Sequence, residues 1–240
     1  MSTVRPALVI GVLALLVLAG GGRAGLARSC APQERWLVRW DSTFAATVKR
    51  PTEIYRKPGR TPFMQVGVAD AYGFPTTLQV IERVQSCSSR WYRVRVAARP
   101  NGATGWISST AVKTTRLRTR IVVDLSRHRL WLYKQGRVVL SSPVAIGKPS
   151  TPTPTGSFYV TQRFIVTSRS GPYGPRAIGI SAFSDVLRNW VDGGPIGIHG
   201  TNEPFAIGNS VSHGCVRMPN DLIVKLFAVT PLGTPVLIRR

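Results

Sequence analysis

The alternation of hydrophobic and polar positions predicts short strands along most of the chain. In the first half, β-branched and aromatic residues gather in Thr77–Val84 and in Trp91–Val96, and the second segment alternates with a period of two. Asn101 and Gly102 then favour a tight turn into Thr104–Ser108, because both residue types tolerate positive φ. The first half therefore predicts a small all-β module.

The second half begins with a basic stretch, Lys113–Arg120, which is expected to be a linker. Strand-like segments follow it at Ile121–Leu125, Leu130–Tyr133, Val138–Ile146, Ser157–Gln162 and Val236–Ile238. Pro149–Gly156 is too rich in proline for a helix or a central strand, so a rigid loop is expected there. A second loop is expected at Ser170–Gly179, which is rich in Gly and Pro.

One helix is expected near the end of the chain. The apolar residues of Leu222–Val229 fall on one helical face, and Asn220 followed by Asp221 is a favourable helix start. With 240 residues, 43% of them hydrophobic, the chain has core material for two domains. We therefore expect a mainly β protein, with a small β-barrel module over residues 44–115 and a second domain over residues 118–240.

The first thirty residues have the order of a secretory signal. Arg5 precedes an uncharged run, Pro6–Gly22, and small residues follow it. This run is short for a spanning helix, which needs roughly 20 apolar residues. We therefore expect residues 1–30 to be a signal peptide cut near Ala24 or Ala27, with a retained N-terminal membrane anchor as the alternative.

The chain is strongly basic, since 32 Lys and Arg against 10 Asp and Glu give a net charge of +22. Such a charge favours polyanionic surroundings, for example nucleic acid, anionic lipid or an acidic cell-wall polymer. The basic residues are scattered, so an Arg-rich solvated surface explains the charge equally well. The export signal, and a sequence without a recognisable nucleic-acid-binding motif, argue against nucleic acid as the partner.

The chain has three cysteines, Cys30, Cys87 and Cys215. Because this number is odd, one thiol of an exported chain stays without a disulfide partner within the chain. The simplest partition pairs Cys30 with Cys87 and leaves Cys215 free, but the sequence alone does not settle this pairing. An unpaired thiol in an oxidising compartment is a candidate for chemistry.

The segment Ile196–Met218 carries the candidate chemistry, because it contains His199, His213, Cys215 and Arg217. A thiol becomes an efficient nucleophile when a nearby imidazole takes its proton. The spacing alone does not decide which histidine is the base. The sequence has neither a CxxC pair nor an HExxH motif, so no metal is expected.

This spacing resembles the signature of the L,D-transpeptidase (YkuD-type) catalytic domain. In that family, His-Gly is followed by a glycine-bearing gap and then by Ser/Thr-His/Lys-Gly-Cys-x-Arg/Asn; the matching parts here are His199-Gly200 and Ser212–Arg217. Thr153–Gly156, which precedes an aromatic strand, also resembles the family. The resemblance implies a β-sandwich-like catalytic domain with few helices, and the N-terminal module resembles bacterial Src-homology-3-like domains.

The resemblance implies a role for each matching residue. Cys215 falls on the nucleophile, and His199 falls on the histidine that accepts and donates the proton. Gly200 falls where a backbone carbonyl orients the catalytic groups, while His213 supports the site electrostatically. Backbone N–H groups around Gly214 and Cys215, in the loop that starts at Ser212, are expected to form the oxyanion pocket.

Three further residues are candidates for contact with the substrate. Arg217 could lower the thiol pKa, pair with a substrate carboxylate or brace the loop, and the sequence does not rank these roles. Tyr173 and Trp190 are expected to line a substrate cleft, with ordinary packing as the alternative. The family implies neither a metal nor an organic cofactor.

The implied function is peptidoglycan L,D-transpeptidation in the cell envelope. Cys215 would take an acyl group from a tetrapeptide stem with release of D-Ala, and the amine of a second stem would then accept it, forming a 3-3 cross-link. Two alternatives stay open: an L,D-carboxypeptidase, which hydrolyses the same acyl-enzyme, and a non-catalytic wall-binding protein.

Overall fold

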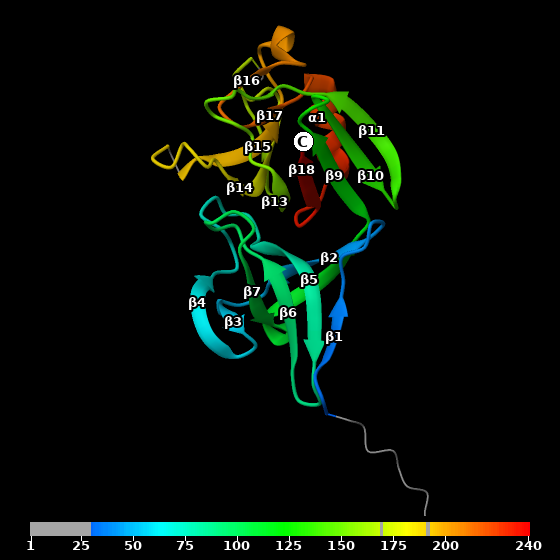
Figure 1. Cartoon of the computed structure of the whole chain (residues 1–240), viewed down its shortest axis with the longest axis vertical. Coiled ribbons are helices and arrows are strands. Elements are labelled where there is room, and N and C mark those ends of the chain that lie inside the picture. Colours follow the sequence, from blue (N-terminus) through cyan, green and yellow to red (C-terminus); the bar gives the residue numbers. More distant parts are fainter. Residues whose placement is uncertain (1–29, 169, 191–192) are drawn as a thin grey trace, which may run out of the picture. The chain divides into compact units, whose positions relative to one another are not determined.

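The computed structural model describes residues 30–168, 170–190 and 193–240. Except for Cys30, the segment expected to be a signal peptide or membrane anchor lies outside the described residues. Among the residues that are described, no helix is long and apolar enough to cross a membrane. The described chain is built mostly of strands, which confirms the mainly β fold class (Figure 1).

An eight-stranded sheet forms the first half. Its strands are β1 (Gln33–Trp36), β2 (Thr43–Val48), β3 (Thr52–Lys57), β4 (Arg60–Val66), β5 (Thr77–Gln85), β6 (Arg90–Arg95), β7 (Thr104–Ser108) and β8 (Val112–Leu117). The order in the sheet is β4-β3-β7-β6-β5-β2-β8, with β1 also paired to β5. Alternate residues such as Val80, Val94 and Ile107 point into one buried core.

The strands expected in this half are confirmed as β5, β6 and β7, and Gly102 has the positive φ of +84° that the turn between β6 and β7 requires. The linker predicted at Lys113–Arg120 is wrong, because these residues form most of β8 and the start of β9. β8 pairs with β2 along its whole length at the edge of the sheet. A Lys- and Arg-bearing sequence suits an edge strand, whose charges discourage pairing with other chains.

A second eight-stranded sheet forms the C-terminal half. Its strands are β9 (Thr119–Asp124), β10 (Arg129–Lys134), β11 (Arg137–Pro143), β13 (Gly156–Ile165), β14 (Arg176–Phe183), β15 (Pro195–His199), β17 (Val216–Arg217) and β18 (Pro235–Arg239). The order is β11-β10-β9-β18-β13-β14-β15-β17, which Figure 1 shows with β18 between β9 and β13. The pairs β9·β18 and β15·β17 are parallel. The short strands β12 (Ile146–Gly147) and β16 (Ser210–Ser212) pair separately.

One prediction for this half is wrong. The loop expected at Ser170–Gly179 ends early, because β14 begins at Arg176; Ile178 is fully buried, so packing extends the strand into a Gly- and Pro-rich segment. The helix α1 spans Asn220–Val229, which confirms the predicted helix start at Asn220. The residue before the helix is Pro219, which makes no side-chain capping hydrogen bond.

The helix α1 packs against β14 and β15. Its side chains Ile223 and Leu226 are fully buried, and Leu222 and Phe227 pack against the same core, which confirms the predicted apolar face. The start of α1 therefore lies near the end of β15, the strand that ends at His199.

We expect Leu226→Ala to lower the free energy of unfolding by about 2–5 kcal/mol, because the truncated side chain leaves a cavity in the core that α1 shares with β14. Val224→Ala, on the exposed side of the same helix, is the matched control and should change it by less than about 0.5 kcal/mol. Urea unfolding followed by circular dichroism measures both. Equal losses in the two variants would contradict this packing.

Candidate active site

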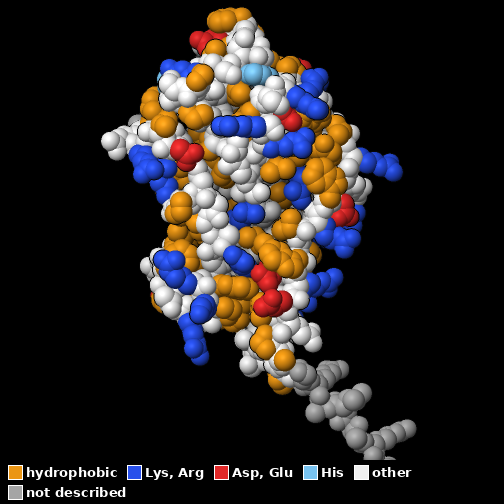
Figure 2. Space-filling model, viewed as in Figure 1, with side chains coloured by type: hydrophobic (Ala, Val, Ile, Leu, Met, Phe, Trp, Pro, Cys, Tyr) orange, Lys and Arg blue, Asp and Glu red, His pale blue; other side chains and the backbone are white. Residues whose placement is uncertain are grey.

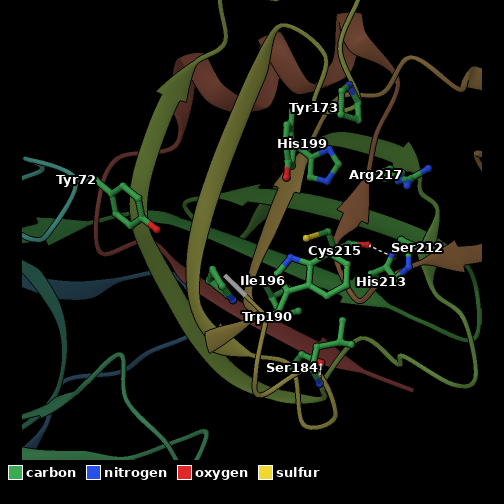
Figure 3. A pocket seen from close by; sticks show the side chains of 14 residues that line it. Tyr72, Tyr173, Ser184, Trp190, Ile196, His199, Ser212, His213, Cys215 and Arg217 are labelled. Atoms are coloured by element: carbon green, nitrogen blue, oxygen red, sulfur yellow. Dashed lines mark hydrogen bonds between the residues drawn. The ribbon is translucent and has the colours of Figure 1, made fainter. Parts of the chain in front are cut away.

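The parallel pairing of β15 with β17 brings the candidate catalytic residues together. In this pairing Ile198 lies opposite Val216, and His199 lies opposite Arg217. Cys215 directly precedes β17 and therefore lies level with Gly197, two residues before His199 and on the same face of the sheet. Both side chains line a cavity of about 420 Å³ (Figure 3).

Seven of the expected site residues line this cavity: Tyr173, Trp190, His199, Ser212, His213, Cys215 and Arg217. The other two, Gly200 and Gly214, do not line the cavity but shape the backbone next to it. The structure therefore gathers the expected residues around one cavity.

His199 is held by the carbonyl of the next residue. Its ring Nδ1 lies 2.6 Å from the carbonyl oxygen of Gly200. A carbonyl oxygen only accepts hydrogen bonds, so Nδ1 carries the proton and Nε2 keeps a free lone pair. Burial lowers the pKa of His199 to about 4, opposed by the Gly200 carbonyl and reinforced by the charge of Arg217. The imidazole is therefore neutral near neutral pH.

Cys215 carries the free thiol, as the simplest partition of the cysteines predicts, while Cys30 and Cys87 are disulfide-bonded. The Gly197 N–H donates to the Cys215 Sγ at 3.4 Å. Burial raises the pKa of the thiol, although the Gly197 hydrogen bond and the charge of Arg217 act in the opposite direction. The resting site therefore pairs a neutral thiol with a neutral imidazole.

The loop before Cys215 is braced by Ser212. The Ser212 hydroxyl donates to the carbonyl of Cys215 at 2.6 Å and accepts from the N–H of Gly214 at 3.1 Å. Gly214 has φ +117°, and a Cβ there would lie 2.8 Å from the side chain of Ile196, so only glycine fits. The N–H of Gly214 is thus already engaged within the loop.

Arg217 has one anchored end and one unpaired nitrogen. Its Nη1 lies 2.5 Å from Oε2 of Glu203, a residue of the loop between β15 and β16. Its Nε is buried and has no hydrogen-bond partner in the described structure. Arg217 therefore braces a neighbouring loop and also acts through its charge on both His199 and Cys215.

Aromatic side chains surround the mouth of the cavity. The Tyr173 ring meets the His199 ring edge-on, with centroids 4.9 Å apart, and the Trp190 ring lies 5.3 Å from the ring of His213. Tyr173 and Trp190 are each about half exposed. Figure 3 shows Trp190 and His213 on the Cys215 side of the cavity and Tyr173 beside His199. This leaves apolar surface available to a ligand next to the thiol.

Sequence reasoning missed several residues that line the cavity, including Tyr72, Ser184, Leu187 and Ile196. Tyr72 comes from the connection between β4 and β5, and its ring packs edge-on against Phe164 at 5.7 Å. No motif marks a tyrosine so far from the thiol in the chain. Within the described residues, the His, Cys, Asp and Glu side chains form no cluster that could hold a metal ion.

Comparison with known proteins places this site in a family. The family model of YkuD, the L,D-transpeptidase catalytic domain, matches residues 118–238, which is half of the chain. The putative L,D-transpeptidase YkuD of Bacillus subtilis is 38% identical over 120 residues, covering 50% of this chain and 65% of the relative. The match therefore spans less than two thirds of that relative's length.

A second relative and a solved structure are also similar. The putative L,D-transpeptidase YqjB of Bacillus subtilis is 36% identical over 128 residues, covering 49% of this chain and 69% of the relative. The catalytic domain of the L,D-transpeptidase from E. faecium, solved by NMR, is 30% identical and has a TM-score of 0.36, covering 50% of this chain and 95% of that one. On the family model and these sequence relatives, the chain belongs to the YkuD family of L,D-transpeptidase catalytic domains.

Proposed function

We propose that this protein is a peptidoglycan L,D-transpeptidase that forms 3-3 cross-links between stem peptides through a cysteine acyl-enzyme. Membership of the family supports the reaction class. The observation that carries the proposal is the shared cavity of Cys215 and a neutral His199 whose Nε2 is free to take a proton. In this proposal, Cys215 is the nucleophile and His199 is the base.

The first step transfers the donor acyl group to sulfur. The substrate carbonyl joins the L-centre of a diamino acid to the terminal D-Ala of a tetrapeptide stem. As Sγ of Cys215 attacks this carbonyl carbon, Nε2 of His199 takes the thiol proton. The tetrahedral intermediate then expels D-Ala, whose amine receives that proton from His199, and a thioester remains.

The second step transfers the acyl group to an amine. His199 removes a proton from the amine of a second stem as this amine attacks the thioester carbonyl. The carbon–sulfur bond breaks, and the proton returns from His199 to the leaving sulfur. If water is the acceptor, the same chemistry makes the protein an L,D-carboxypeptidase.

The other expected residues have supporting roles in this proposal. The backbone N–H of Cys215 is the proposed oxyanion donor, because the N–H of Gly214 already bonds to Ser212. Arg217 lines the cavity, so its guanidinium charge is suited to a carboxylate of the stem peptide. Tyr173 and Trp190 supply apolar contact area at the mouth of the cavity.

We further propose that the protein works outside the cytoplasm, at the cell wall. The N-terminal sheet would serve as a Src-homology-3-like module that positions the catalytic domain on the wall. Figure 2 shows Lys and Arg side chains scattered over the visible face instead of gathered in one patch. A dispersed positive charge suits weak, sequence-independent attraction to anionic wall polymers. Residues 1–30 would supply the export signal or a membrane anchor.

Replacing single catalytic residues tests this assignment. With a disaccharide-tetrapeptide as substrate, we expect Cys215→Ala to form no product, because no acyl-enzyme can form. His199→Gln should lose about 10²–10⁴-fold in rate, the usual contribution of a general base. His213→Gln, the matched control histidine, should keep measurable activity. Mass spectrometry of the products measures all three.

The products also separate the candidate functions. A dimer lacking one D-Ala indicates a transpeptidase, and a tripeptide alone indicates a carboxypeptidase. An unchanged substrate with wild-type protein would contradict both and support the wall-binding alternative. Equal losses in His199→Gln and His213→Gln would contradict the choice of His199 as base.

The pH dependence of kcat/KM provides a second test. His199 acts as a base only when neutral, and its pKa is lowered to about 4, so acid inactivates the site only at low pH. We expect kcat/KM to be flat between about pH 5 and pH 8 and to fall below about pH 4, with circular dichroism confirming that the fold persists. A midpoint near 6.5, the ordinary value for histidine, would refute the buried, neutral imidazole.

A further inference from the structure

Asn220 makes contacts that its place at the start of α1 does not require. Asn220 is exposed to solvent, yet the oxygen and the nitrogen of its side-chain amide both bond to the backbone just after β15. Oδ1 accepts from the backbone N–H of Thr201 at 2.8 Å, and Nδ2 donates to the carbonyl of Thr201 at 2.9 Å. The side chain therefore holds one distant residue through two hydrogen bonds.

The first of these bonds reaches His199 through a single peptide group. The N–H of Thr201 and the carbonyl of Gly200 belong to the same peptide plane, which is rigid. That carbonyl oxygen accepts from Nδ1 of His199 at 2.6 Å. Holding the N–H edge of the plane thus fixes the direction of the oxygen that orients the imidazole. Hydrogen bonds at both ends of one amide also polarise and strengthen each other.

Two glycines pack so closely against the Asn220 amide that neither has room for a Cβ. A Cβ added at Gly200 would lie 2.3 Å from Oδ1 of Asn220, and one added at Gly174 would lie equally close to that atom. Gly174 also has φ +59°, a conformation that glycine adopts readily. Gly174 and Gly200, which are far apart in the sequence, therefore both pack against the Oδ1 atom of Asn220.

We propose that Asn220 is a positioning residue for catalysis, which holds the Gly200–Thr201 peptide so that its carbonyl fixes the His199 ring with Nε2 directed to the reaction. The inference rests on the proposed role of His199 as base. Asn220 itself does not touch the reacting atoms. Its contribution is geometric, and small displacements of catalytic groups can lower rates by about 10²-fold.

Kinetics of three variants test this role. Asn220→Ala removes both hydrogen bonds, and we expect kcat to fall about 10²-fold while KM changes little. Asn220→Asp keeps an oxygen acceptor for the N–H of Thr201, so it should recover part of this loss. Asp221→Asn is the control and should keep wild-type kcat, because in the described part of the chain that exposed side chain forms a surface ion pair with Lys225.

A readout that needs no turnover separates this inference from the proposed function. In ¹⁵N-histidine-labelled full chain, NMR should show His199 with its proton on Nδ1 and none on Nε2. In Asn220→Ala we expect a mixture of the two tautomers, and in Asp221→Asn the wild-type signal. Such a shift in a chain that forms no product would support the inference while contradicting the proposed function.

Three outcomes would overturn the proposal. The first is an unchanged His199 tautomer and an unchanged kcat in Asn220→Ala. The second is an Asn220→Asp variant that is folded and as impaired as Asn220→Ala, because the retained acceptor would then do nothing. The third is an equal loss of kcat in Asp221→Asn, which would indicate a general effect of disturbing the start of α1.

Discussion

The hydrogen bond from Nδ1 of His199 to the carbonyl of Gly200 is the contact on which the site depends. This hydrogen bond decides which ring nitrogen can accept a proton. The carbonyl oxygen only accepts hydrogen bonds, so Nδ1 must carry the ring proton and Nε2 is left without one. The parallel pairing of β15 with β17 then sets this ring beside Cys215. Without the backbone contact, the same two side chains could meet with the wrong tautomer, and the thiol would have no acceptor for its proton.

Burial acts on the two reacting groups in opposite directions. It raises the pKa of the Cys215 thiol and lowers that of the His199 imidazole, so both charged forms are disfavoured in the resting cavity. The charge of Arg217 favours the thiolate but disfavours the imidazolium. In the proposed mechanism, the proton therefore moves only as sulfur attacks a carbonyl, when the loop can stabilise the developing oxyanion. A resting thiol of this kind is also less exposed to chance oxidation.

The sequence was informative where chemistry needs fixed residue types at fixed spacing. Cys215 and His199 could be picked out as a candidate nucleophile and a candidate base because this chemistry and its tight glycine loop leave a short pattern. The strands could be predicted from alternation. The edge strand β8 could not, since its charged residues resemble a linker until pairing with β2 is known. Tyr72 lines the cavity through tertiary packing alone, which leaves no local signal.

Asn220 shows a different limit of sequence reasoning. Asparagine ahead of an apolar helical face favours a helix start, and α1 does begin at Asn220. The hydrogen bonds of its amide to Thr201 could not be predicted, because they form only when the fold brings the end of β15 against the start of α1. This contact of Asn220 depends on tertiary structure and leaves no local signal in the sequence.

The ultraviolet absorbance of the Cys215 thiolate, measured against pH in the substrate-free chain, tests the neutral resting pair most directly. Cys215→Ser supplies the baseline, because Cys30 and Cys87 are disulfide-bonded and do not titrate. With the thiol pKa raised by burial, the account predicts thiolate absorbance only above the ordinary cysteine range of about 8.5. A thiolate that forms between about pH 5 and pH 7 would reveal an ion pair with His199 and contradict the account.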